Sequence, residues 1–430
     1  MERSIEQITT EELLTYVQSG EGSVVDVRPL SAYNGWRLEG ESRGGHIKGA
    51  KSIPLTWTRY MDWVEVLEEK GIQKDEPVIV YGYNYDGIWR MAKQLMDLGY
   101  NQVLTYDNFI NEWSRDEELP VERLKRYSQL VHPEWVYQLI NNQDVPNYDG
   151  KDYVLCHSHY GYIEDYEKGH IPGAVALDTN RLEASETWNR RSPEELKETL
   201  EELGIRHDTM VVIYGRFSAP VYDEEKFPGK SAGHLGAMRA AAIMMYAGVE
   251  DVRILNGGIT SWERAGYETS TTRSFPKAVD DFGIAIPGHP EYMVDTPEAK
   301  ELINSDDGEL VSVRSWEEFI GKRSGYHYIE EKGRIPGAVF GNCGSDAYHM
   351  ENYRNFDHTI READEVAQKW AEEGVVPEKK NAFYCGTGWR GSEAFINAYL
   401  MGWPNIAVYD GGWYEWSGNG GNPIETGKPN

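Results

Sequence analysis

The sequence has few cysteines, a deficit of basic residues and no long apolar run. Three cysteines in 430 residues are too few for a disulfide framework and favour a reducing compartment. Lys and Arg number 43 against 71 Asp and Glu, a formal net charge of -28. This balance argues against nucleic acid and against a membrane surface as partners, because both are negatively charged. No stretch approaches the roughly 18 apolar residues of a membrane span.

The first residues, Met1–Leu14, also lack the apolar core of an export signal. We therefore expect a cytoplasmic protein. A chain whose leader had already been removed would read the same, and would then be periplasmic or exported.

What the sequence does contain is one unit repeated three times. The matching segments are GHIKGA at 45–50 and VIVYG at 78–82, GHIPGA at 169–174 and VVIYGR at 211–216, and GRIPGA at 333–338 and AFYCGTGWR at 382–390. A repeat of this length is a whole domain. We predict a first copy at 1–127, a second at 128–275 and a third at 291–430, with a linker at 276–290.

Short β-branched runs alternate with amphipathic stretches in each copy. The helical period is clear at Glu11–Gln18, Pro193–Gly204 and Asp364–Gly374. Apolar strands alternating with helices predict an α/β fold, in which each copy forms an open, mostly parallel sheet with helices on both faces.

Only the third copy has a cysteine at the end of its predicted central strand. Asn381–Tyr384 is typical of a buried strand and Ser392–Met401 of a helix, with CGTGWR between them. Backbone N–H groups converge in such a turn, and together with the helix N-terminus they favour a thiolate. The pattern predicts a reactive Cys385. Its candidate binding loop consists of Gly386, Thr387, Gly388, Trp389 and Arg390.

Two other chemistries share parts of this pattern. Gly386, Gly388 and Gly391, followed downstream by Asp410, match a dinucleotide-binding fingerprint, but the equivalent turns of the other copies lack these glycines. A cysteine-dependent phosphatase or arsenate reductase needs one more residue between cysteine and arginine to enclose a phosphate. The shorter loop suits a sulfur atom on the thiolate better.

The third copy resembles the rhodanese superfamily of sulfurtransferases. The matching motifs are the strand Val311–Arg314, the GRIPGA turn, the Cys385–Arg390 loop and DGG-x3-W at Asp410–Trp416. Three copies with a cysteine only in the last are similar to bacterial rhodaneses of three tandem domains. The resemblance implies a rhodanese-like fold for each copy, and a Cys385 that carries sulfur as a persulfide without a metal or an organic cofactor.

The resemblance also implies the partners of the reaction. The sulfur donor is thiosulfate, 3-mercaptopyruvate or a protein persulfide, and the acceptor is a thiol, a protein cysteine or another nucleophile. The first two copies lack the thiol and are expected to serve as scaffold, pocket wall or docking platform. The rival interpretation is a non-catalytic rhodanese scaffold that only binds or stores a persulfide.

Several residues keep two interpretations each. Arg314 is either a second cation of the site or part of a structural ion pair, and Trp389 either closes the donor pocket or packs against another copy. Cys156, beside two histidines, is a core residue or a metal ligand, and Cys343 is a structural or a resolving thiol. Glu318 stands where two-domain relatives carry a substrate-binding arginine, so their donor site is not carried over. The polar insertion at 217–235 has no assigned role.

Overall fold

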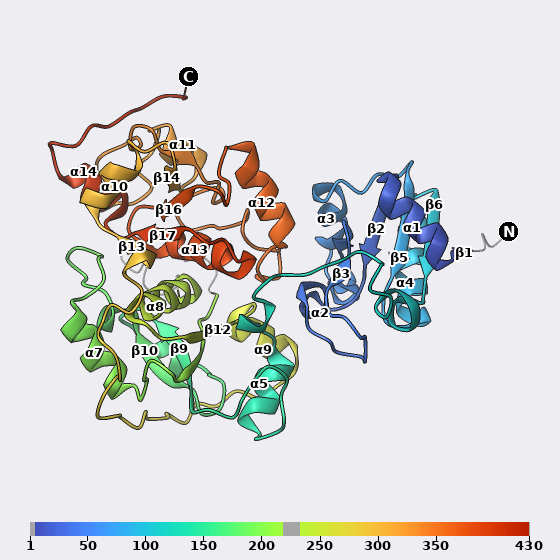
Figure 1. The fold of residues 1–430 in the computed structure, drawn as a ribbon, viewed down its shortest axis with the longest axis horizontal. Coiled ribbons are helices and arrows are strands. Elements are labelled where there is room, and N and C mark those ends of the chain that lie inside the picture. Colours follow the sequence, from blue (N-terminus) through green and yellow to red (C-terminus); the bar gives the residue numbers. More distant parts are fainter. Residues whose placement is uncertain (1–4, 218–232, 430) are drawn as a thin grey trace. The chain divides into compact units, whose positions relative to one another are not determined.

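The computed structural model describes residues 5–217 and 233–429 and divides into two compact units, Met1–Ser128 and Gln129–Asn430 (Figure 1). The first unit holds the first copy, and the second unit holds the other two. Most of the insertion at 217–235 lies outside the described residues. The predicted domain boundaries stay predictions.

The first unit is built on a five-stranded parallel sheet of order β1-β6-β5-β2-β4. Its strands are β1 (Glu6–Gln7), β2 (Ser23–Asp26), β4 (Lys51–Ser52), β5 (Pro77–Tyr81) and β6 (Gln102–Tyr106). Its α-helices are α1 (Thr10–Ser19), α2 (Leu30–Asn34), α3 (Trp63–Glu69) and α4 (Tyr85–Asp97). A short antiparallel pair, β3 (His46–Ile47) and β7 (Val121–Glu122), lies outside the sheet.

The second copy repeats this parallel arrangement in the order β10-β9-β11-β12-β8. Its strands are β8 (Leu130–Val131), β9 (Tyr153–His159), β10 (Val175–Asp178), β11 (Met210–Tyr214) and β12 (Asp251–Leu255). Its α-helices are α5 (Pro133–Ile140), α6 (Glu164–Glu167), α7 (Pro193–Glu202), α8 (Gly233–Ala247) and α9 (Gly258–Arg264), with a short 3-10 helix, η4 (Thr179–Arg181).

The third copy has the same parallel topology, β13-β17-β16-β14-β15. Its strands are β13 (Met293–Val294), β14 (Gly308–Ser312), β15 (Val339–Phe340), β16 (Lys380–Tyr384) and β17 (Ile406–Tyr409). Its helices are α10 (Thr296–Leu302), α11 (Trp316–Phe319), α12 (Ala363–Glu372), α13 (Trp389–Met401) and α14 (Gly412–Gly418). The predicted α/β fold with parallel sheets is confirmed.

Local sequence signals set where several helices begin and end. Thr9 and Glu12 form a capping box at the start of α1, and Gly20 ends that helix in the left-handed conformation at φ 71°. Ser315 and Glu318 form the same kind of capping box at α11. Reciprocal bonds of this kind satisfy the backbone N–H groups that a helix leaves unpaired at its first turn.

Helices α8 and α13 join the second and third copies. They pack directly against each other in the unit of residues 129–430 (Figure 1). Both helices are buried along most of their length, so neither has the polar face of a helix exposed to solvent. The joint between the two copies is therefore part of the interior of this unit.

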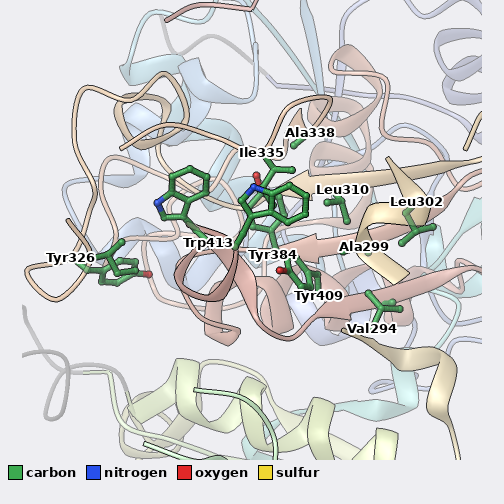
Figure 2. Close-up of a cluster of buried hydrophobic side chains, with 14 of the residues drawn as sticks. Val294, Ala299, Leu302, Leu310, Tyr326, Ile335, Ala338, Tyr384, Tyr409 and Trp413 are labelled. Atoms are coloured by element: carbon green, nitrogen blue, oxygen red, sulfur yellow. The ribbon is translucent and has the colours of Figure 1, made fainter. Parts of the chain in front are cut away.

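The third copy has its own apolar core beside the sheet. Figure 2 shows Tyr384, Tyr409 and Trp413 gathered next to the strands, with Tyr326 on a loop at the edge of the group. Tyr384 is the last residue of β16, so the strand that leads to Cys385 is anchored in this core. Among the described residues, no helix is long and apolar enough to cross a bilayer.

Candidate active site

Cys385 lies at the turn between β16 and α13, where the sequence analysis predicted it, and its side chain is fully buried. The turn is held from one side by α14. The N–H of Trp413 donates to the carbonyl of Cys385 at 2.8 Å, and the N–H of Tyr414 donates to that of Gly386 at 2.8 Å. Gly412, at φ 55°, allows this approach, because a Cβ there would lie 2.4 Å from the Thr387 carbonyl oxygen.

The backbone amides of the loop are left available. Within the described part of the chain, the N–H groups of Gly386, Thr387 and Gly388 donate to no protein acceptor. Unpaired amides beside a thiol and at a helix N-terminus form a suitable setting for an anionic sulfur.

A buried ion cluster lies behind the loop. Arg390 donates from Nη1 to Glu318 Oε2 at 3.0 Å and from Nη2 to Glu318 Oε1 at 2.9 Å, in the bidentate geometry of a strong pair. Arg314 donates from Nε to Glu318 Oε1 at 3.3 Å and from Nη1 to the Gly333 carbonyl at 2.7 Å. Arg314 thus forms an ion pair, as one of its two interpretations expected, and its role as a second cation of the site stays a prediction.

Glu318 is the carboxylate that joins both arginines. Burial alone would raise the pKa of Glu318, but the guanidinium groups of Arg390 and Arg314 outweigh burial and lower it to about 2. Sequence reasoning treated Glu318 only as a departure from relatives. Its capping-box spacing from Ser315 was the signal that could have found it.

Tyr326 was missed by the sequence analysis. Its ring fills the space beside Gly386, where a Cβ would lie 2.0 Å from Tyr326 Cε2. Its hydroxyl accepts from Arg390 Nη2 at 2.8 Å, so its own proton is free to be donated elsewhere. Burial raises the pKa of Tyr326 well above its ordinary value, which keeps the phenol protonated at neutral pH.

Trp389 reaches into the second copy. Its indole Nε1 donates to Glu183 Oε1 at 2.7 Å, and its ring meets Tyr160 edge-on at 5.4 Å between centroids. Glu183 also accepts from Arg239 Nε at 2.9 Å. Trp389 therefore packs against another copy, which was one of its two interpretations, and neither Glu183 nor Arg239 was singled out from sequence.

The other two cysteines are buried and free. Burial raises the pKa of Cys156 to about 12, and the described residues contain no group of side chains that could hold a metal ion. Cys343 accepts from Arg390 Nη1 at 3.3 Å, and burial raises the pKa of Cys343 to about 12. At Cys343 burial thus outweighs the opposing pull of the Arg390 guanidinium on the pKa, and the resolving role of this thiol stays a prediction.

The dinucleotide alternative finds no support in the position of Asp410. Asp410 is fully buried and accepts from Arg239 at 2.5 Å and from Arg190 at 2.8 Å. Gly391 has a packing role, because a Cβ there would lie 2.9 Å from the Phe383 carbonyl oxygen.

The chain was compared with known families and curated proteins. A family model described as a rhodanese-like domain matches three times, at residues 9–116, 132–265 and 295–419. Thiosulfate sulfurtransferase YnjE of Escherichia coli (strain K12) is 39% identical over 419 residues, covering 96% of this chain and 91% of YnjE. Sulfur carrier protein TtuD of Thermus thermophilus is 28% identical over 311 residues, covering 70% of this chain and 97% of TtuD.

Among solved structures, wild-type EanB is 51% identical, with a TM-score of 0.97 and 99% of both chains covered. Variants of EanB have been solved with hercynine, with ergothioneine, and with ergothioneine covalently linked to a persulfide cysteine. The residues replaced in these variants include a tyrosine 59 residues before that cysteine, cysteines 73 and 42 residues before it and a threonine two residues after it. At the same separations from Cys385 this chain has Tyr326, Cys343 and Thr387, but Ser312 in place of the first of the two cysteines.

The three matched segments cover most of the chain, and the curated relatives transfer or carry sulfur. These findings support sulfurtransferase activity. The chain belongs to the rhodanese-like domain family, as a protein of three tandem copies.

Proposed function

We propose that this chain transfers a sulfane sulfur through a persulfide on Cys385 to an imidazole carbon of hercynine, forming ergothioneine. The observation that carries the proposal is the agreement with EanB in residue type at three of the four positions replaced in these variants, each at the same sequence separation from the cysteine, within 51% overall identity. In this chain two of those residues, Tyr326 and Cys343, both contact Arg390.

The first half-reaction loads the cysteine. The Cys385 thiolate attacks the outer sulfur of a donor such as thiosulfate, a new S–S bond forms, and sulfite leaves with the electron pair of the broken bond. With 3-mercaptopyruvate or a protein persulfide, pyruvate or the donor thiolate leaves instead. We assign stabilisation of the charge that collects on the persulfide to the unpaired amides of the Gly386–Gly388 turn.

The second half-reaction consumes the persulfide. The imidazole carbon of hercynine bonds to the terminal sulfur, the S–S bond breaks, and its electron pair leaves with Cys385. We assign the protonated hydroxyl of Tyr326 as the donor that gives Cys385 its proton. The carbon then loses its own proton, which returns to the Tyr326 oxygen, and the thione remains. The carbon is oxidised by two electrons and the sulfane sulfur is reduced to the level of a sulfide, so no external oxidant is needed.

Aromatic rings near the loop support a betaine acceptor. Tyr160 stacks on Trp188 with 5.7 Å between ring centroids, and Trp188 stacks on Tyr328 at 5.6 Å. Tyr328 continues the row to Tyr326 at 5.2 Å. Aromatic faces attract quaternary ammonium groups such as the trimethylammonium group of hercynine.

The test separates the two half-reactions. The protein is incubated with thiosulfate, 3-mercaptopyruvate or a protein persulfide, and the mass of the Cys385 peptide is measured by mass spectrometry without reductant. Hercynine is then added and ergothioneine is measured by mass spectrometry. We expect one added sulfur on Cys385 and its transfer to hercynine. Cys385→Ser should abolish both steps, whereas Cys156→Ala should retain both.

Two outcomes would refute the proposal. A persulfide that passes sulfur to cyanide or thiols but never to hercynine would refute the acceptor and favour a thiosulfate sulfurtransferase. A Cys385 that takes no sulfur from any donor would favour the scaffold interpretation.

A further inference from the structure

The side chain of Trp389 is held by the second copy although its backbone belongs to the third. Trp389 is the first residue of α13, directly after the thiol turn. Its indole nitrogen donates to Glu183, which follows η4 in the second copy and is fully buried. The far edge of the indole lies over Gly236 of α8, where a Cβ would be 3.5 Å from Trp389 Cη2.

Arg239 of α8 lies against the same turn. A Cβ on Gly388 would be 2.6 Å from Arg239 Nη1 and 2.8 Å from its Cζ, so the guanidinium occupies the space that a side chain at 388 would need. Arg239 also donates to Glu183 Oε2 at 2.9 Å, to Asp410 Oδ1 at 2.5 Å and to the Trp188 carbonyl at 2.9 Å. Its side chain is fully buried.

Asp410 connects this cluster to the other side of the turn. It directly precedes Gly411 and Gly412, and Gly412 lies against the carbonyl groups of the thiol turn. Asp410 also accepts from the Arg190 backbone N–H at 2.9 Å and from Arg190 Nη1 at 2.8 Å. The second copy thus contacts the thiol turn at Gly388 and Trp389, and reaches it again through Asp410.

We propose that Glu183 and Arg239 are positioning residues for sulfur transfer at Cys385, which they influence through Trp389, Gly388 and Asp410. This inference rests on the proposed function. Two helices need only apolar contacts to pack, whereas a buried carboxylate and guanidinium cost desolvation free energy. What such a pair provides is a fixed geometry of the turn. A fixed geometry matters because a displacement of about 1 Å in a reacting group lowers rates by up to about 100-fold. The second copy, which has no thiol, completes the site of the third.

The experiment is a double-mutant cycle on the full chain. Glu183→Gln removes the negative charge that pairs with Arg239. Trp389→Phe removes the indole N–H while keeping an aromatic ring. Cys385 is loaded with sulfur, the loaded fraction is measured by mass, and the rate of a single round of transfer is followed with hercynine and, separately, with cyanide. Glu194→Gln, an exposed carboxylate of the second copy, is the matched control.

We expect each variant to load Cys385 fully and to transfer sulfur about 10- to 100-fold more slowly to both acceptors. The double variant should be no slower than the slower single variant, because both changes break one connection. Glu194→Gln should match the wild type. Thermal unfolding measured alongside separates this effect from a loss of fold.

The pH profile provides a readout that a merely structural role would not change. Glu183 faces Arg239 from α8, Asp410 after β17, Tyr160 after β9 and the indole of Trp389. Burial raises the pKa of Glu183 to about 7, against the opposing pull of Arg239. The wild-type transfer rate should rise as pH increases through 7, and Glu183→Gln should lack that rise.

Folded variants that transfer at the wild-type rate to both acceptors would overturn the inference. If Glu183→Gln does not fold, Trp389→Phe alone decides it. If the wild type transfers sulfur to cyanide but not to hercynine, the proposed function fails while the rates with cyanide still test the positioning role.

Discussion

Glu318→Gln should lower the free energy of unfolding of the unit of residues 129–430 at neutral pH. In the folded protein the pKa of Glu318 is about 2, against an ordinary value of 4.5. A difference of about 2.5 in pKa corresponds to about 3 kcal/mol by which the ionised form is favoured over the neutral one. Because the Gln amide resembles the neutral acid in shape and charge, we expect a loss of about 3 kcal/mol, which falls in the range for breaking a buried pair.

The dependence on pH identifies the source of this loss. The unfolded chain binds a proton at Glu318 at higher pH than the folded chain does, so the wild type loses this contribution as pH falls from about 5 towards 2. Glu318→Gln has no such loss, so the difference in free energy of unfolding between the two proteins should narrow. Urea unfolding at pH 7 and pH 3.5 measures this difference. Glu317→Gln, which removes a surface ion pair with Arg323, is the control. An equal difference at both pH values would refute the electrostatic reasoning.

Two further substitutions test close packing and a second ion pair. Gly386→Ala should lower sulfur transfer at least tenfold and cost about 1–3 kcal/mol, because its Cβ would lie 2.0 Å from a ring carbon of Tyr326. Gly420→Ala, with no described atom within 4 Å of its Cβ, is the control, and equal transfer rates for the two variants would contradict the packing argument. Arg28→Met in the first unit should destabilise that unit by about 3–5 kcal/mol, because it takes the guanidinium charge, 2.6 Å away, from the fully buried carboxylate of Asp26. Hydrogen exchange in peptides from residues 5–128 measures this, and unchanged exchange would show that the pair contributes little.

The sequence was sufficient to predict the parts of the protein that are local. Three parallel α/β copies follow from strand runs, helical periods and a repeated turn, all of which are encoded within a few residues of where they act. The position of Cys385 between a strand and a helix is of the same kind. The strand β16 ends at Tyr384 and the helix α13 begins at Trp389, close to the predicted Asn381–Tyr384 and Ser392–Met401.

The rest of the candidate site depends on contacts between distant segments. Glu183 and Trp389 are 206 residues apart in the chain and meet only because α8 and α13 pack together. Tyr326 lies in a stretch without helix or strand, where no periodicity marks a residue as buried. A lone Glu or Arg in an acidic sequence is most often exposed, so nothing distinguished Glu183 or Arg239 beforehand.

The packing of α8 against α13 makes the smallest fragment with an intact site larger than the repeated unit. The unit that repeats in the sequence is one domain long. A fragment containing only 295–419 would nevertheless expose α13, of which eleven residues are buried in the whole chain, and would leave Asp410 without either arginine. The smallest piece that keeps the site intact is therefore a pair of copies. A chain cut back to its third copy should therefore lose the sulfur transfer proposed for Cys385, because the side chains of Trp389 and Asp410 would lose their partners in the second copy.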